Sequence, residues 1–163
     1  MSDAFLDALL ALIGQECWGV VGGEGTGSII SLKIGARTPR SKPVDNQHLS
    51  ELVRQYNSAY TFMIYCPWRI DSVAKVVSGS HMSNNNDGPM VSGFASICGQ
   101  KVIAVTCSAP AFDVRLDFEN QHTLVIHCSG IGMDEDECYA FGTPKGWFTV
   151  GLDGNLTLEP NNT

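Results

Sequence analysis

Three side chains with metal-binding chemistry lie near one another in the second half of the chain: His127, Cys128 and Cys138. Imidazole nitrogen and thiolate sulfur are common zinc ligands, and a zinc site requires them to converge on one point. His127 and Cys128 are adjacent in a strand-like run, so their side chains should leave opposite faces of the strand. His127 also matches Tyr65 in an earlier run of the same pattern. The sequence therefore favours structural roles over a metal site.

A glycine-rich stretch from Gly22 to Ser28 has the glycine spacing of a phosphate-binding loop. Such a loop requires a lysine before its serine or threonine and a helix after it. Here Ser28 stands at the lysine position, and residues 29–34 alternate like a strand. A corresponding segment later in the chain, residues 107–111, has no glycine. We therefore predict a hairpin connection in which at least one glycine takes a positive φ.

Four consecutive acids, Asp134, Glu135, Asp136 and Glu137, form a strong charge cluster. A calcium-binding EF-hand loop needs alternating oxygen ligands, a central glycine and a distal glutamate, and this run lacks that order. Two interpretations remain open. The run is either a solvated loop between two strands or an acidic surface that contacts a basic partner.

Trp68 and Arg69 directly follow a strand-like run. An indole and a guanidinium at adjacent surface positions could form a stacked pair that contacts a partner. Packing of Trp68 in the core or at its rim is the alternative.

No Ser/Cys–His–Asp arrangement stands at a recognisable nucleophile elbow, and no carboxylate pair is singled out. We therefore expect a protein that is not an enzyme, with no catalytic residues, no cofactor and no metal.

The elements that would carry these residues are mostly short strands. Apolar residues at helical spacing predict one helix over residues 2–13, with Ser2 as its N-cap and Gly14 after its end. Short alternating runs with turn residues between them follow. Two further short helices are indicated at residues 48–56 and 90–96.

The chain contains an internal repeat, from residues 13–66 and again over residues 98–128. Each copy has three strand-like runs, which predicts a three-stranded meander. The matched runs are Ile13–Val20 with Cys98–Val105, Ser28–Ile34 with Phe112–Phe118, and Thr61–Cys66 with Thr123–Cys128. A C-terminal hairpin is predicted over residues 139–160, and Trp18 and Trp147 fit strand positions that face a core. We expect a single domain over residues 1–163. Its class is α+β, mainly antiparallel sheet built from the two meanders, with the N-terminal helix packed on the sheet.

Charge and composition limit the classes of partner. The net charge is −7, of which residues 101–163 carry −6. Nucleic-acid binding requires clustered Lys and Arg, so it is excluded, whereas a basic protein partner is compatible. No apolar run is long enough for a membrane span, and no basic leader precedes the first apolar stretch. We therefore expect a cytoplasmic protein, no membrane association, and reduced thiols at all six cysteines.

The strand and turn pattern resembles that of a group of small, largely uncharacterised bacterial proteins. The segments that carry the resemblance are Gln15–Val20, Gly27–Gly35, Tyr60–Ile70, Gly99–Val105 and Tyr139–Gly151. This chain has "YAFGTP" where those proteins have a plain "FTP". Proteins of this appearance resemble immunity proteins of bacterial toxin systems, which bind a toxin and block its active site. The resemblance brings no catalytic residues with it.

These observations lead to one principal expectation and two alternatives. The principal expectation is a protein-binding module, an immunity-type inhibitor of a basic toxin, that uses the acids at 134–137 with Trp68 and Arg69. The first alternative is a small-ligand or metal-binding module with a site between the two repeats, around His127, Cys66 and Trp68. The second is a homodimeric accessory subunit that pairs through an exposed edge strand.

Overall fold

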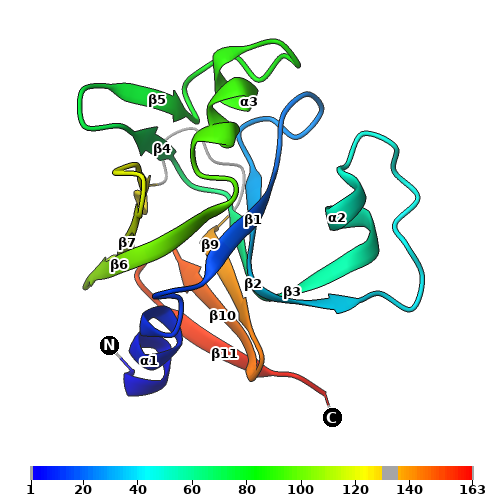
Figure 1. Cartoon of the computed structure of the whole chain (residues 1–163). Coiled ribbons are helices and arrows are strands. Elements are labelled where there is room, and N and C mark those ends of the chain that lie inside the picture. Colours follow the sequence, from blue (N-terminus) through cyan, green and yellow to red (C-terminus); the bar gives the residue numbers. More distant parts are fainter. Residues whose placement is uncertain (1, 130–135, 163) are drawn as a thin grey trace.

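The computed structural model describes residues 2–129 and 136–162. This part of the chain folds mainly into antiparallel strands with a few short helices (Figure 1). The strands are β1 (Glu16–Val21), β2 (Ile30–Pro39), β3 (Tyr56–Ile64), β4 (Trp68–Asp71), β5 (Val76–Gly79), β6 (Gln100–Ser108), β7 (Asp113–Phe118), β8 (Thr123–Ile126), β9 (Glu137–Thr143), β10 (Gly146–Gly151) and β11 (Leu156–Pro160). The helices are α1 (Asp3–Leu10), α2 (Glu51–Gln55), α3 (Pro89–Gly93) and the 3₁₀ turn η1 (Phe94–Ser96).

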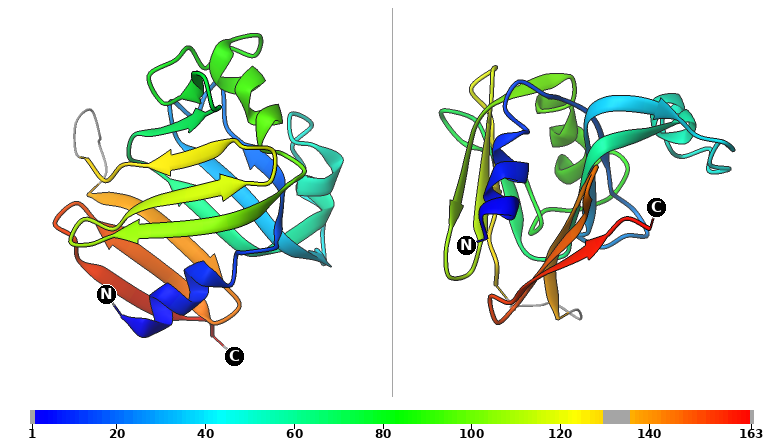
Figure 2. Two further views of the ribbon diagram at one scale, coloured as in Figure 1. Left: turned by 60° about the vertical axis from the view of Figure 1, so that its left-hand side comes forward. Right: turned by 90° about the horizontal axis from the view of Figure 1, so that it is seen from below.

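All strands pair antiparallel in the order β11-β10-β9-β3-β2-β1-β6-β7-β8-β4-β5. The sheet bends where β1 meets β6, because these strands share only the pairs Glu16–Lys101 and Cys17–Gln100. We call the part from β11 to β1 the first layer and the part from β6 to β5 the second layer. The two layers face each other across the core (Figure 2). The prediction of a mainly antiparallel sheet with an N-terminal helix is confirmed.

Helix α1 begins as the sequence predicts. The Ser2 side chain accepts a hydrogen bond from the Phe5 amide, which satisfies one of the free N–H groups of the first turn. The helix ends at Leu10, earlier than the predicted residue 13, and the chain tightens into a turn that reaches Gly14 at φ 86°. Phe5 and Leu9, one helical turn apart, are fully buried. Helix α1 therefore packs on the open edge of the two layers, with Phe5 in edge contact with Phe148 at 5.2 Å.

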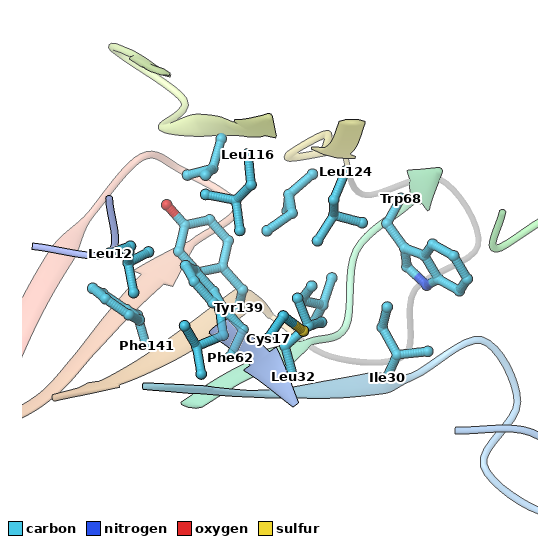
Figure 3. Packing of buried hydrophobic residues seen from close by; sticks show 14 of the residues in the cluster. Leu12, Cys17, Ile30, Leu32, Phe62, Trp68, Leu116, Leu124, Tyr139 and Phe141 are labelled. Atoms are coloured by element: carbon cyan, nitrogen blue, oxygen red, sulfur yellow. The ribbon is translucent and has the colours of Figure 1, made fainter. Parts of the chain in front are cut away.

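The core lies between the layers and follows the strand alternation (Figure 3). From the first layer come Leu32, Phe62 and Phe141, and from the second layer Leu116 and Leu124, all fully buried. Successive side chains of a strand leave opposite faces, so the residues between these apolar positions lie on the outer faces of the layers. The outer faces are where the polar chemistry of this protein is placed.

Trp147 corrects one prediction. The alternation of β10 places Phe148 and Val150 in the core and leaves Trp147 on the outer face, with 39 % of its surface exposed. Its indole lies over Gly142 of the neighbouring strand β9, where a Cβ atom would stand 2.8 Å from the ring. Because Gly142 has no side chain, the ring lies flat on the sheet there. Trp18, the other predicted core tryptophan, is buried.

The glycine-rich stretch is a connection between two paired strands. Strand β1 ends before Gly22, strand β2 begins after Ser28, and the two strands pair antiparallel. Gly23, Gly25 and Gly27 all have positive φ, so the predicted hairpin and its predicted backbone are confirmed. Both predicted short helices also form, one as α2 and the other as α3 with η1.

The strand order contains two runs of sequential neighbours, β1-β2-β3 and β6-β7-β8. Each run is a set of hairpins, and each has a register shift near the start of its first strand, between Cys17 and Gly19 in β1 and between Val102 and Ala104 in β6. That these runs are two copies of one unit stays a prediction.

Among the described residues, no helix is long and apolar enough to cross a membrane.

Candidate functional sites

Three cysteines converge where the two layers exchange strands. The Sγ atoms of Cys66, Cys128 and Cys138 all lie within 4.8 Å of one another, and each comes from a different segment of the chain. Cys66 follows β3, Cys128 follows β8 and Cys138 lies in β9. Cys66 and Cys138 are buried, and Cys128 is half-buried. We call these three residues the thiol cluster.

Backbone hydrogen bonds fix the segments that carry the thiol cluster. The Cys66 amide donates to the carbonyl of Cys138 at 3.0 Å. The Cys128 amide donates to Oδ1 of Asp113 at 2.7 Å. Backbone amides therefore position the segments that carry the sulfurs, and the three thiols hydrogen-bond to one another.

The environment of the thiol cluster favours neutral thiols. The hydrogen bond with Cys66, together with burial, raises the pKa of Cys128. Burial, then the neighbouring Cys128, raises the pKa of Cys138 to about 12. Burial, with Cys128 nearby, also raises the pKa of Cys107 to about 11. All six cysteines are free, and the raised pKa values keep Cys107, Cys128 and Cys138 protonated at neutral pH.

His127 does not join the thiol cluster. Its side chain is exposed, and its Nδ1 lies 3.2 Å from Oδ2 of Asp113. The adjacent Cys128, which like His127 lies after the end of β8, is half-buried and packs against the core. Of the three metal-binding candidates in this segment, the structure thus brings Cys128 and Cys138 together with Cys66 and leaves the imidazole outside. The sequence already paired Cys66 with Cys128 as matched positions, which is the signal that could have identified this group.

The acidic run is described only in part. Asp134 and Glu135 lie outside the described residues. Asp136 and Glu137 are exposed, with Glu137 at the start of β9. The carbonyl of Asp136 accepts a hydrogen bond from the Leu152 amide at 2.9 Å, which ties this segment to the end of β10.

Trp68 and Arg69 point in opposite directions. Trp68 is 3 % exposed, and its indole N–H donates to the carbonyl of Ser28 at 2.7 Å. Its ring is therefore part of the core rather than a surface contact (Figure 3). Arg69 is exposed, and its Nε forms an ion pair with Asp71 at 2.9 Å. The two side chains do not form the stacked pair that the sequence suggested as one alternative.

A polar hollow of about 450 Å³ lies on the outer face of the first layer. Its floor contains Lys33, Thr61 and Trp147, and Arg40 lies at its wall. Sequence reasoning placed Trp147 in the core and did not single out Lys33, Arg40 or Thr61, because their spacing in the chain follows no known motif. Only the strand alternation, which puts Lys33 opposite the buried Leu32 and Ile34, could have indicated an outward cation here.

Comparison of the chain with protein-family models, with curated proteins and with solved structures finds no match.

Proposed function

We propose that this protein is a non-enzymatic binding module and that the thiol cluster is its principal site, where it holds a thiophilic metal ion such as Zn²⁺ or Cu⁺. The observation that carries the proposal is the convergence of Cys66, Cys128 and Cys138 within 4.8 Å. Soft thiolate ligands select these ions over magnesium or calcium, which prefer oxygen.

The spacing of the sulfurs fits such an ion after a small adjustment. Zinc–sulfur bonds of about 2.3 Å in a tetrahedral site place the sulfur atoms roughly 3.8 Å apart. The three sulfurs therefore need to approach one another by no more than about 1 Å to ligate one ion. Because Cys128 is the one residue of the cluster that is only half-buried, we expect an ion to enter beside it. A solvent molecule would complete four-coordination.

Metal binding at this cluster must release protons. The thiols of Cys128 and Cys138 have raised pKa values, so at neutral pH each carries a proton that a metal ion has to displace. The affinity should therefore increase with pH. A divalent cation next to the sulfurs favours the thiolate form, which reverses the effect of burial.

We also propose that the two runs of strands, β1-β2-β3 and β6-β7-β8, are two copies of one three-stranded meander. This interpretation is supported by matched hydrogen bonds at the junction: the Gly14 amide donates to the carbonyl of Val102 at 2.7 Å, and the Gly99 amide donates to the carbonyl of Cys17 at 2.6 Å. In this two-copy interpretation, Cys66 and Cys128 are matched residues that leave the third strand of each copy. Their approach to each other is then a consequence of the pseudo-twofold arrangement of the copies.

The test is a metal titration under reducing conditions. Purified protein is equilibrated with Zn²⁺ or Cu⁺, and bound metal is measured after gel filtration. We expect one equivalent per chain, release of protons into weak buffer, and a thiolate-to-metal absorption band with Cd²⁺. Cys66→Ser, Cys128→Ser and Cys138→Ser should each weaken binding, whereas Cys98→Ser, at an exposed cysteine outside the cluster, should not. Metal well below one equivalent would remove the proposal.

A second candidate function is recognition of a basic protein partner, of the immunity type that the sequence resemblance implies. Helix α1 and the turn after it favour this function, because Leu6 and Leu10 of the helix and Ile13 of the turn are exposed apolar residues, with exposed fractions of 39 %, 44 % and 46 %. Asp3 and Asp7 are exposed on the same helix, so acidic groups lie near these apolar residues. Apolar surface with a charged rim is the usual anatomy of a protein interface.

This second candidate is tested with the product of the neighbouring gene. Co-expression and pull-down should recover a complex, and the protein should protect cells against that product. Leu10→Asp should abolish the complex, whereas Leu152→Asp, at an exposed leucine in the turn after β10, should leave it intact. Absence of both a complex and protection would exclude this function.

Light scattering of the protein alone tests the homodimer alternative, which predicts a dimer through edge strand β5 or β11.

A further inference from the structure

The hollow on the outer face of the first layer is built across four neighbouring strands. Lys33 of β2 pairs with Thr61 of β3, Thr61 with Gly142 of β9, and Gly142 with Trp147 of β10. We call this line of residues the first rung. Because Gly142 has no side chain, the indole of Trp147 lies over it and borders the hollow next to Thr61. The segment after β2 supplies Arg40 as a wall.

The charges of this hollow are of one sign. Lys33 and Arg40 both line it, and no acidic residue does. Among residues 2–129 and 136–162, neither cation forms an ion pair. Nε of Arg40 donates to the carbonyl of Val53 at 3.3 Å, which anchors the guanidinium and leaves its other N–H groups free to donate. The chain as a whole has a net charge of −7, yet this hollow holds two cations. A bound anion would neutralise their charge.

Neutral donors stand beside the cations. The hydroxyls of Ser58 and Thr61 lie 2.8 Å apart and share one hydrogen bond, so one of the two O–H groups remains to donate elsewhere. The amide side chain of Asn57 is exposed at the same wall. The indole of Trp147 adds an apolar surface next to these polar groups. The hollow therefore offers charge, directed donors and a flat wall together.

The matching line of the second layer has its charges neutralised internally. There Asp117 of β7 pairs with Thr123 of β8, and Thr123 pairs with Asp71 of β4. We call this line the second rung. Arg115 forms an ion pair with Asp117 at 3.0 Å, and Arg69 forms one with Asp71 at 2.9 Å. Among the residues that the structure describes, the two cations that flank the second rung are thus ion-paired, whereas Lys33 and Arg40 at the first rung are not.

We propose that this hollow binds a small ligand through an oxyanion group, a phosphate or a carboxylate, held by Lys33 and Arg40 with the ligand body against the indole of Trp147. Guanidinium and ammonium donors form the strongest hydrogen bonds to such groups. The volume of about 450 Å³ holds more than the oxyanion alone, which leaves space for the rest of the ligand. This site is independent of the thiol cluster.

The titration behaviour of Lys33 agrees with this assignment. Burial lowers the pKa of Lys33, and the positive charge of Arg40 lowers it further. A bound oxyanion reverses the second effect by placing negative charge between the two cations. Ligand binding and protonation of Lys33 should therefore support each other.

The test is a titration of the full-length protein with inorganic phosphate and, separately, with acetate, at constant ionic strength held by chloride. Tryptophan fluorescence, to which Trp18 and Trp68 also contribute, and amide NMR shifts are followed together. We expect a saturable response with at least one of the two anions, with shifts centred on Thr61 and Gly142. The anion that binds more tightly identifies the ligand group as phosphate or carboxylate.

Matched variants separate the site from general attraction of anions. Lys33→Gln and Arg40→Gln should each weaken binding at least about tenfold, because each removes a charged hydrogen-bond donor. Arg115→Gln removes a cation of the second rung and should leave the affinity unchanged. Absence of a saturable response to both anions overturns the proposal, as does a response equal in all variants. If a variant does not fold, shifts of the wild-type protein outside the first rung overturn it instead.

Discussion

The first and second rungs occupy corresponding places on the outer faces of the two layers, yet their chemistry differs. In both, a threonine stands between its two strand neighbours: Thr61 between Lys33 and Gly142, and Thr123 between Asp117 and Asp71. The threonine of the second rung accepts from Arg115 and donates to Asp117. In the part of the chain that the structure describes, Ser58 is the only side-chain hydrogen-bond partner of Thr61 in the first rung. The same register thus supports either a closed ion-pair network or an open cationic hollow.

The connections between strands explain much of this difference. Strands β7 and β8 are joined by residues 119–122, whereas β2 and β3 are joined by residues 40–55, which include helix α2. Val53 of α2 packs on the outer face of β1, where its Cγ2 stands 3.1 Å from the place of a Cβ on Gly19. The longer connection brings Arg40 to the end of the first rung. The strand register therefore determines the direction of each side chain on the sheet. The segments that connect the strands determine which other residues lie next to that side chain.

We expect a substitution at Gly142 to reduce the chemical difference between the two rungs the most. Gly142→Asp places a carboxylate where the second rung has Asp71, beside Lys33 and Arg40. The new carboxylate would neutralise the cations and repel an anionic ligand, so we expect phosphate affinity to fall about a hundredfold. Fluorescence titration with phosphate measures this effect.

Gly142→Asn is the control for that substitution. Both variants add a Cβ that stands 2.8 Å from the Trp147 ring, so both displace the indole, but only the aspartate adds charge. We expect the asparagine variant to bind phosphate far more tightly than the aspartate variant. Equal losses in the two variants would show that the position of the indole, rather than the cations, controls binding.

Stability gives a second way to sharpen the comparison. Thr123→Val removes a hydroxyl that bonds the charged groups of Asp117 and Arg115 and is 7 % exposed, so we expect a loss of roughly 1–2 kcal/mol in the free energy of unfolding. Thr61→Val removes only a hydroxyl–hydroxyl bond, and its loss should be about 0.5 kcal/mol. Urea denaturation at pH 7 measures both. A larger loss for Thr61→Val would contradict the closed network assigned to the second rung.

The sequence predicts the elements better than it predicts these rungs. The N-cap at Ser2 and the hairpin at Gly22 are local features, encoded by residues that lie next to one another in the chain. The orientation of Trp147 is not local, because alternation defines two faces without telling which one meets the core. In β10, Phe148 and Val150 share one face and Trp147 lies on the other. The face with Phe148 and Val150 packs in the core, so the indole lies outside it.

The candidate sites depend even more on distant contacts. In the thiol cluster, Cys66 is more than 60 residues away in the chain from Cys128 and Cys138, and only the matched positions of Cys66 and Cys128 hint at the contact. Lys33 lies in an open hollow because its partners across the sheet, Gly19 and Thr61, carry no acid. No acidic side chain of the described residues lines the hollow near Arg40. Neither spacing nor composition reports such a property. It follows from strand order, which is decided by the packing of the whole core.

The smallest expected effect concerns the protonation of Lys33. Its pKa in the folded protein lies below the ordinary value of 10.5, so just below pH 10.5 the unfolded chain binds more protons at this residue than the folded chain. The stability of the wild-type protein, relative to Lys33→Gln, should therefore rise with pH across that window and stay level at lower pH. Thiol ionisation occurs in both proteins and cancels in the difference. Urea denaturation at several pH values measures this difference. Saturating phosphate should reduce the rise, because it restores the pKa of Lys33; a difference that falls with pH would mean that Lys33 gains a carboxylate partner, as the cations of the second rung do.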